Sequence, residues 1–177
     1  MRTLLLLRHA KAVKEPADDD AARALSPEGE EACARVGRFL AAAGVAPDVL
    51  LTSPAVRAAD TLARVAAEAG WQAPQQVRPF YETTPGGVLV TLRELPGDVE
   101  VVLAVGHEPT WSETLSRLIG GGSVKLSTGA VAAVGLDLKK GWGELSGGRG
   151  ELLWLISPKL LAGQVLAAPR DQAVASQ

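Results

Sequence analysis

Short apolar runs alternate along the chain with longer segments in which apolar residues recur every three or four positions. Residues 4–7 are four consecutive leucines, and residues 48–53 and 101–105 form two further runs. Unbroken apolar runs of this length are typical of strands that are buried on both faces of a parallel sheet. The pattern therefore predicts an α/β fold.

The segments between these runs carry the signals of helices. Residues 26–44 begin with a good capping residue, Ser26, followed by a proline that fits the first helical position. Residues 54–70 form the next expected helix, with Ser53 as its cap, and both segments end at a glycine. Two further helices are expected, over residues 83–95 and 108–119.

The remaining segments complete a three-layer sandwich of helix, sheet and helix. Residues 77–81 read as a short strand, and residues 129–137 and 151–157 as an antiparallel pair joined by a glycine-rich turn. The resulting sheet is mixed but mostly parallel. We expect one domain over residues 1–162 and a loosely ordered tail over 163–177, which is rich in Ala, Gln and Ser.

Composition excludes several classes of protein. The 177 residues are 47% hydrophobic and 21% charged, as in one ordinary globular domain. The net charge of −2 and the 4% of aromatic residues argue against nucleic-acid binding. One cysteine, Cys33, and two histidines rule out a disulfide framework and make a zinc site unexpected. Without a signal peptide or a membrane span of roughly 20 apolar residues, we expect a cytoplasmic protein.

A polar loop follows the first strand and contains the acidic triplet Asp18-Asp19-Asp20. Three carboxylates could hold a cation, but no glycine-punctuated calcium pattern follows them. A solvated surface loop is therefore the expected structure.

Reactive side chains recur where the predicted strands end. Arg8 and His9 follow the first strand, Arg57 lies in the first turn of the helix after the second, His107 follows the third, and Glu82 follows the short strand. Open α/β sheets bind ligands at the carboxyl ends of their strands. Arg8-His9 alone would fit the polar end of any buried strand, but both histidines in this position favour a common site.

This set of residues fits phosphoryl transfer. A neutral imidazole is a good nucleophile towards phosphorus, and two guanidiniums can bind the nonbridging oxygens through bidentate hydrogen bonds. A second imidazole can donate to the same oxygens, and a carboxylic acid can protonate the leaving group. Since this reaction depends mostly on positioning and electrostatics, neither a metal nor a cofactor is required.

Three motifs follow one another along the chain: Leu7–Ala10, Ser53–Thr61 and Val105–His107. Leu25–Gly29 and Glu82–Gly86 support them. Together these motifs resemble the histidine phosphatase superfamily, which has the phosphoglycerate-mutase-like fold. The small size and the Arg-His-Ala-Lys-Ala opening are most similar to its SixA-type phosphohistidine phosphatase branch. The resemblance covers residues 4 to about 157.

The resemblance implies a role for each site residue. His9 would be the nucleophile, and Arg8, Arg57 and His107 would grip the phosphoryl group. Arg23 stands where the SixA-type branch has an arginine that faces the phosphate pocket.

Two positions qualify this assignment. Glu82 matches the position of the general acid of the superfamily, but an imidazole leaving group departs easily, so Glu82 could be partly structural. Ala10 replaces the glycine of the superfamily's Arg-His-Gly, and its methyl group slightly crowds the pocket floor.

Trp142, in the glycine-rich turn, either touches substrate or packs in the core.

Chain length bears on the substrate. Only 24 residues separate Glu82 from His107, which leaves little chain for a lid. An open pocket suits a phosphohistidine on another protein, with inorganic phosphate as product. Small phosphomonoesters are the alternative substrates, whereas a mutase would need an enclosed site.

A noncatalytic phosphate-binding module is the alternative from another class, and the presence of both histidines counts against it. A nucleotide-binding domain is not expected, because no glycine-rich phosphate loop occurs.

Overall fold

The computed structural model describes residues 1–14 and 19–163, so Asp18 and nearly all of the predicted loose tail lie outside the described residues. The strands are β1 (Arg2–Arg8), β2 (Val49–Thr52), β3 (Gln75–Gln76), β4 (Val101–Gly106), β5 (Val131–Leu136) and β6 (Gly150–Ile156). The helices are α1 (Pro27–Ala42), α2 (Val56–Ala69), α3 (Pro85–Arg93), α4 (Thr110–Leu118) and α5 (Pro158–Leu161), with 3-10 turns η1 (Asp20–Ala22), η2 (Arg78–Phe80) and η3 (Trp142–Glu144). No helix in the described ranges is both long enough and apolar enough to span a membrane.

The strands form one mixed sheet in the order β3-β2-β4-β1-β5-β6. β1 lies at its centre, parallel to β4 and antiparallel to β5. β2 pairs in parallel with both β3 and β4, and β6 is antiparallel to β5. The predicted mostly parallel sheet with an antiparallel addition is confirmed.

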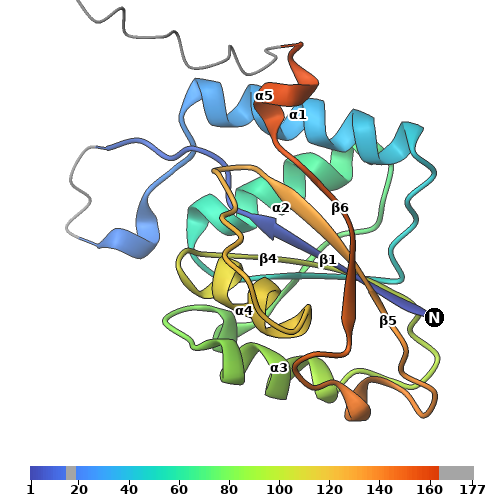
Figure 1. Cartoon of the computed structure of the whole chain (residues 1–177). Coiled ribbons are helices and arrows are strands. Elements are labelled where there is room, and N and C mark those ends of the chain that lie inside the picture. The colour runs from blue at the N-terminus through green and yellow to red at the C-terminus, as the bar shows by residue number, and fades with distance from the viewer. Residues whose placement is uncertain (15–18, 164–177) are drawn as a thin grey trace, which may run out of the picture.

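The four leucines of β1 feed two separate cores. Leu4 and Leu6 pack on one face with residues of α3 and α4, and Leu5 and Leu7 pack on the other with residues of α1 and α2. Alternation along a strand explains this division, because successive side chains point to opposite faces. Figure 1 shows the two helical layers on either side of the sheet, which confirms the predicted sandwich.

The predicted helix boundaries are correct for α1 and wrong at the start of α2. Ser26 caps α1 by accepting a hydrogen bond from the Gly29 amide, at 3.2 Å. α2 begins at Val56 and has no side-chain cap, because Ala55 ahead of it is extended. Ser53 is therefore too far upstream to cap the helix, and its hydroxyl is used elsewhere.

The strand predicted over residues 77–81 is also wrong. Pairing with β2 stops at Gln76, and Arg78–Phe80 form a 3-10 turn instead. Pro79 explains the difference, since proline has no amide hydrogen to donate to a ladder and its φ is fixed. The turn carries the chain from the sheet edge towards the carboxyl ends of the strands.

Trp142 and Cys33 both belong to the core. Trp142 is fully buried, and its indole N–H donates to the Val99 carbonyl at 2.9 Å. Cys33 is buried in α1, and burial raises the pKa of its thiol to about 11. A thiol with this pKa remains protonated at neutral pH, so Cys33 serves packing, as does the buried Trp142.

We expect Gly29→Ala to lower the free energy of unfolding by about 2 kcal/mol or more. A Cβ at Gly29 would lie 2.1 Å from the carbonyl oxygen of Lys11, a backbone atom that cannot rotate away. Urea denaturation followed by circular dichroism measures the effect. Gly97→Ala is the matched control, since a Cβ there meets nothing within 4 Å. Equal effects of the two substitutions would contradict this packing account.

Candidate functional site

The register of the central strands brings the two histidines together. Arg8 of β1 lies opposite Gly106 of β4, so the residues that follow, His9 and His107, leave the sheet side by side. Their ring centroids are 5.1 Å apart, and the rings are tilted by 53°. The His9 amide donates to the Gly106 carbonyl at 3.0 Å, which extends the ladder by one bond into the site.

The ring of His9 is held in one orientation. Its Nδ1 lies 2.8 Å from the carbonyl oxygen of Ala10. A carbonyl can only accept, so Nδ1 carries the hydrogen and Nε2 keeps a free lone pair. The Ala10 amide donates to Thr61 Oγ1 at 2.9 Å, and that hydroxyl donates to the Arg57 carbonyl at 2.6 Å. Helix α2 thereby fixes the backbone beside His9.

Both imidazoles are neutral at neutral pH. The pKa of His9 is lowered to about 4, mainly by burial and to a smaller extent by the positive charges of Arg57, Arg8 and Arg23, while the hydrogen bond to the Ala10 carbonyl opposes the shift. Burial, followed by the charges of His9 and Arg57, lowers the pKa of His107 to about 3. The fixed positive charge of the site therefore belongs to guanidiniums, and His9 Nε2 is available as a nucleophile.

Arg57 is buried at the start of α2, with its side chain only 6% exposed. Nη1 donates to the carbonyl oxygen of Asp20 at 2.6 Å, and Nη2 donates to its carboxylate at 2.8 Å. Nε is buried and has no partner in the described part of the chain. Asp20 thus binds the end of the guanidinium and leaves its Nε edge free for an anion.

Arg23 reaches the site through the same aspartate. Its Nε donates to Asp20 Oδ1 at 2.9 Å, so one carboxylate bridges Arg23 and Arg57. The acidic triplet, expected as a solvated surface loop, therefore contributes one of its carboxylates to the site. The other two aspartates differ, since Asp19 caps η1 and Asp18 lies outside the described residues.

Arg8 is held by a second chain of hydrogen bonds. Its Nη1 donates to the Leu126 carbonyl at 2.8 Å, and its Nε is buried without a partner among the described residues. The Leu126 amide donates to Ser112 Oγ at 2.9 Å, and Ser112 donates to the Glu108 carboxylate at 2.7 Å. The loop that binds Arg8 is thus tied to the first turn of α4.

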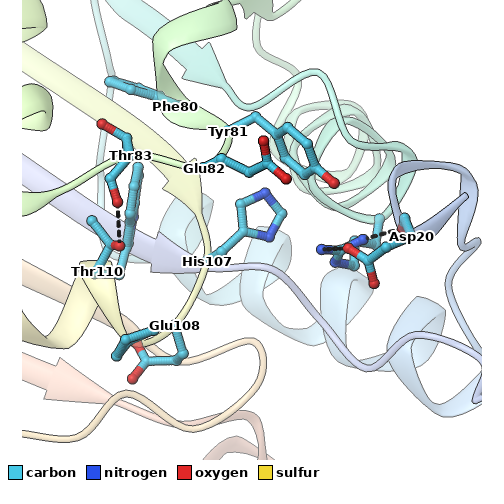
Figure 2. A pocket seen from close by; sticks show the side chains of 11 residues that line it. Asp20, Phe80, Tyr81, Glu82, Thr83, His107, Glu108 and Thr110 are labelled. Atoms are coloured by element: carbon cyan, nitrogen blue, oxygen red, sulfur yellow. Dashed lines mark hydrogen bonds and ion pairs between the residues drawn. The ribbon is translucent and has the colours of Figure 1, made fainter.

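A cavity of about 290 Å³ is lined by Arg57 and His107, but not by Arg8 or His9, and is drawn in Figure 2. The Tyr81 ring meets the His107 ring edge to face, with centroids 5.7 Å apart. Glu82 lies next to Tyr81 with φ at +53°, a backbone conformation that costs a residue with a side chain about 1 kcal/mol or more. The lining residues are Asp20, Arg57, Phe80, Tyr81, Glu82, Thr83, His107, Glu108, Pro109, Thr110 and Trp111.

The structure brings together Arg8, His9, Arg57 and His107, places Glu82 on the wall of the cavity, and connects Arg23 through Asp20. In the described ranges, no three His, Cys, Asp or Glu side chains are grouped as a metal site.

Sequence reasoning missed three residues of the site, Asp20, Ser53 and Thr61. Thr61 had a readable signal, because it follows Arg57 by four residues and so shares its helix face. Asp20 and Ser53 depend on contacts between segments distant in sequence, which no local pattern records.

Comparisons with known proteins point in one direction. Residues 4–88 match the model of the histidine phosphatase superfamily (branch 1). An uncharacterised protein of Mycobacterium tuberculosis strain H37Rv is 34% identical over 106 residues, which are 60% of this chain and 65% of that protein. The chain thus spans slightly less than two thirds of the length of this relative.

Two solved structures extend the similarity over nearly the whole fold. The structure of the protein histidine phosphatase SixA complexed with tungstate is 25% identical, with a TM-score of 0.79 over 90% of this chain and 99% of that one. A protein from Nakamurella multipartitia, described as a phosphohistidine phosphatase SixA, is 27% identical, with a TM-score of 0.74 over 89% and 96% of the two chains.

We expect neither histidine to become protonated above about pH 5. A two-histidine chain gives a simple NMR titration, with midpoints of about 4 for His9 and about 3 for His107. The urea-unfolded protein, with midpoints near 6.5, is the control. Because the unfolded chain binds more protons below pH 6.5, the free energy of unfolding should fall as the pH falls towards 4. A folded-state midpoint of 6 or higher for His9 would contradict the assignment.

Proposed function

We propose that this chain is a member of the histidine phosphatase superfamily and hydrolyses phosphohistidine on another protein through a covalent intermediate on His9. One observation carries the proposal. The neutral imidazole of His9, with Nε2 free, lies within one site with the guanidiniums of Arg8 and Arg57, whose buried Nε–H groups have no partner in the described residues.

In the first step, His9 Nε2 attacks the phosphorus atom of the substrate. The P–N bond to the substrate imidazole breaks, and its electron pair goes to the departing nitrogen. Arg8 and Arg57 donate to the nonbridging oxygens and offset their charge during the displacement. His107 is placed to donate to the same group, since it lines the cavity 5.1 Å from His9.

In the second step, water attacks the phosphorus atom of phospho-His9. The bond between Nε2 and phosphorus breaks, the electron pair returns to Nε2, and inorganic phosphate leaves. The hydrogen bond from Nδ1 to the Ala10 carbonyl keeps Nε2 as the reacting nitrogen in both steps. The chemistry needs no group that the chain does not supply.

The shape of the site supports a protein substrate. Asp20 and Glu82 on the cavity wall are both exposed, so the phosphoryl site is reached directly from solvent. One SixA structure in the comparisons is described as a protein histidine phosphatase in complex with tungstate, a tetrahedral oxyanion, and another as a phosphohistidine phosphatase. Both observations favour a phosphorylated side chain over an enclosed metabolite.

A small-molecule phosphomonoesterase is the second candidate, and the position of Glu82 favours it. This carboxyl lines the cavity on a strained backbone. A carboxylic acid there could protonate an alkoxide leaving group, which an imidazole leaving group does not require.

We expect faster turnover of a phosphohistidine-bearing protein than of p-nitrophenyl phosphate, measured as kcat/KM under the same conditions. His9→Ala should reduce both activities to the background rate, with an unchanged circular dichroism spectrum. Activity on the small ester alone would move the function to a phosphomonoesterase. Near-normal activity of His9→Ala would remove His9 as the nucleophile.

We expect Glu82→Gln to separate the two candidate substrates. Phosphohistidine turnover should stay within about threefold, whereas an alkyl phosphate monoester should lose about 100-fold, because only the alkoxide needs a proton from a general acid. Glu113→Gln, an exposed acidic residue in the first turn of α4, is the matched control. An equal large loss on both substrates would give Glu82 a structural role.

A further inference from the structure

Ser53 is fully buried at the carboxyl end of β2, beside the second histidine. The register of β2 with β4 places it there, since Thr52 lies opposite Val105 and the Ser53 amide donates to the Val105 carbonyl at 3.1 Å. Its Oγ lies 2.8 Å from His107 Nε2. This contact connects Ser53, which does not line the cavity, to His107, which does.

The direction of this hydrogen bond follows from the neighbours of Ser53. Its Oγ accepts a hydrogen bond from the Ala55 amide at 3.3 Å. Among the described residues, the only acceptor near the hydroxyl hydrogen is His107 Nε2. The hydroxyl therefore donates to Nε2, which must be unprotonated to accept.

A neutral imidazole that accepts at Nε2 carries its single hydrogen on Nδ1. His107 Nδ1 is buried and has no partner in the described part of the chain. Leaving a buried N–H without an acceptor costs about 1–3 kcal/mol, so such a group calls for an acceptor that arrives with a ligand.

Arg8 and Arg57 follow the same pattern. Each is held at its Nη1 end, by the Leu126 carbonyl or by Asp20, and each keeps a buried Nε–H unpaired within the described residues. With His107 Nδ1, three elements of the fold thus supply three unpaired nitrogens around one site. In Arg8, Arg57 and His107 alike, a second nitrogen of the side chain is held by a hydrogen bond.

We propose that Ser53 is a positioning residue that holds His107 in the Nδ1–H tautomer, so that Nδ1 donates a hydrogen bond to a nonbridging oxygen of the phosphoryl group. The identity of that group rests on the proposed function. In the opposite tautomer, the lone pair of Nδ1 would repel the same oxygen. Removing one such donor from a preorganised site typically costs about 100-fold or more in rate.

The tautomer can be measured directly by 15N NMR of the two imidazoles. Wild-type His107 should show a protonated Nδ1 and an unprotonated Nε2, with a change at Nδ1 when inorganic phosphate binds. In Ser53→Ala the population should shift towards Nε2–H, phosphate should bind more weakly, and kcat/KM should fall about 100-fold. A wild-type Nε2–H tautomer, or a Ser53→Ala protein with unchanged tautomer and rate, would overturn the proposal.

Two further variants separate positioning from packing. Thr52→Val removes the neighbouring buried hydroxyl, which donates to the Ser53 carbonyl at 3.1 Å rather than to His107, so tautomer and rate should be kept. Ser53→Thr keeps a hydroxyl and should restore the Nδ1–H tautomer and most of the rate. The proposal would be overturned if Thr52→Val lost the Nδ1–H tautomer of His107, or if Ser53→Thr had the same tautomer and rate as Ser53→Ala. Either result would mean that Ser53 acts through packing alone.

These readouts are independent of the substrate. If the protein fails to hydrolyse phosphohistidine, the proposed function fails, while the tautomer and the affinity for inorganic phosphate still decide the role of Ser53.

Discussion

The register between β1 and β4 is the constraint on which the whole site depends. Because Arg8 pairs with Gly106, the two residues that follow leave the sheet together, and the imidazoles of His9 and His107 come within contact of one another. A slip of one residue would turn every side chain of a strand to the opposite face. Both strands are buried on both faces, and their leucines and valines fill two separate cores, so any such slip would disrupt both cores at once. The hydrophobic packing of the sheet therefore also determines the geometry of the chemistry.

The electrostatics of the site divide two tasks between two kinds of residue. The guanidiniums of Arg8 and Arg57 supply the positive charge of the site, whereas burial beside those charges lowers the pKa of both imidazoles, so that they are neutral at neutral pH. A nucleophile with a free lone pair can thus lie beside permanent cations that attract a phosphoryl group. The arginines are oriented by partners on the side away from their free Nε groups, the Asp20 carboxylate for Arg57 and the Leu126 carbonyl for Arg8. Orientation before the substrate arrives is what makes such donors effective in the transition state.

Much of the fold and of the site follows from local sequence pattern. The buried strands, the Ser26 cap, the glycine stops and the reactive residues at strand ends are all local signals, and the structure places Arg8, His9, Arg57 and His107 in one site. The two errors have local causes as well. Pro79 ended a strand that its apolar neighbours suggested, and an extended Ala55 left Ser53 outside the helix it was expected to cap. In both cases a backbone restriction outweighed a side-chain preference.

The sequence by itself determined the fold class, the carriers of the phosphoryl chemistry and the strand ends from which they project, because periodicity and capping act over a few residues. Only the tertiary structure decided which neighbours set the orientation, tautomer and pKa of those residues. Asp20 binds Arg57 across 37 positions, and Ser53 reaches His107 across 54. Hydrogen-bond direction, tautomer and pKa depend on such long-range contacts and on burial, and these arise only when the sheet has assembled in its register.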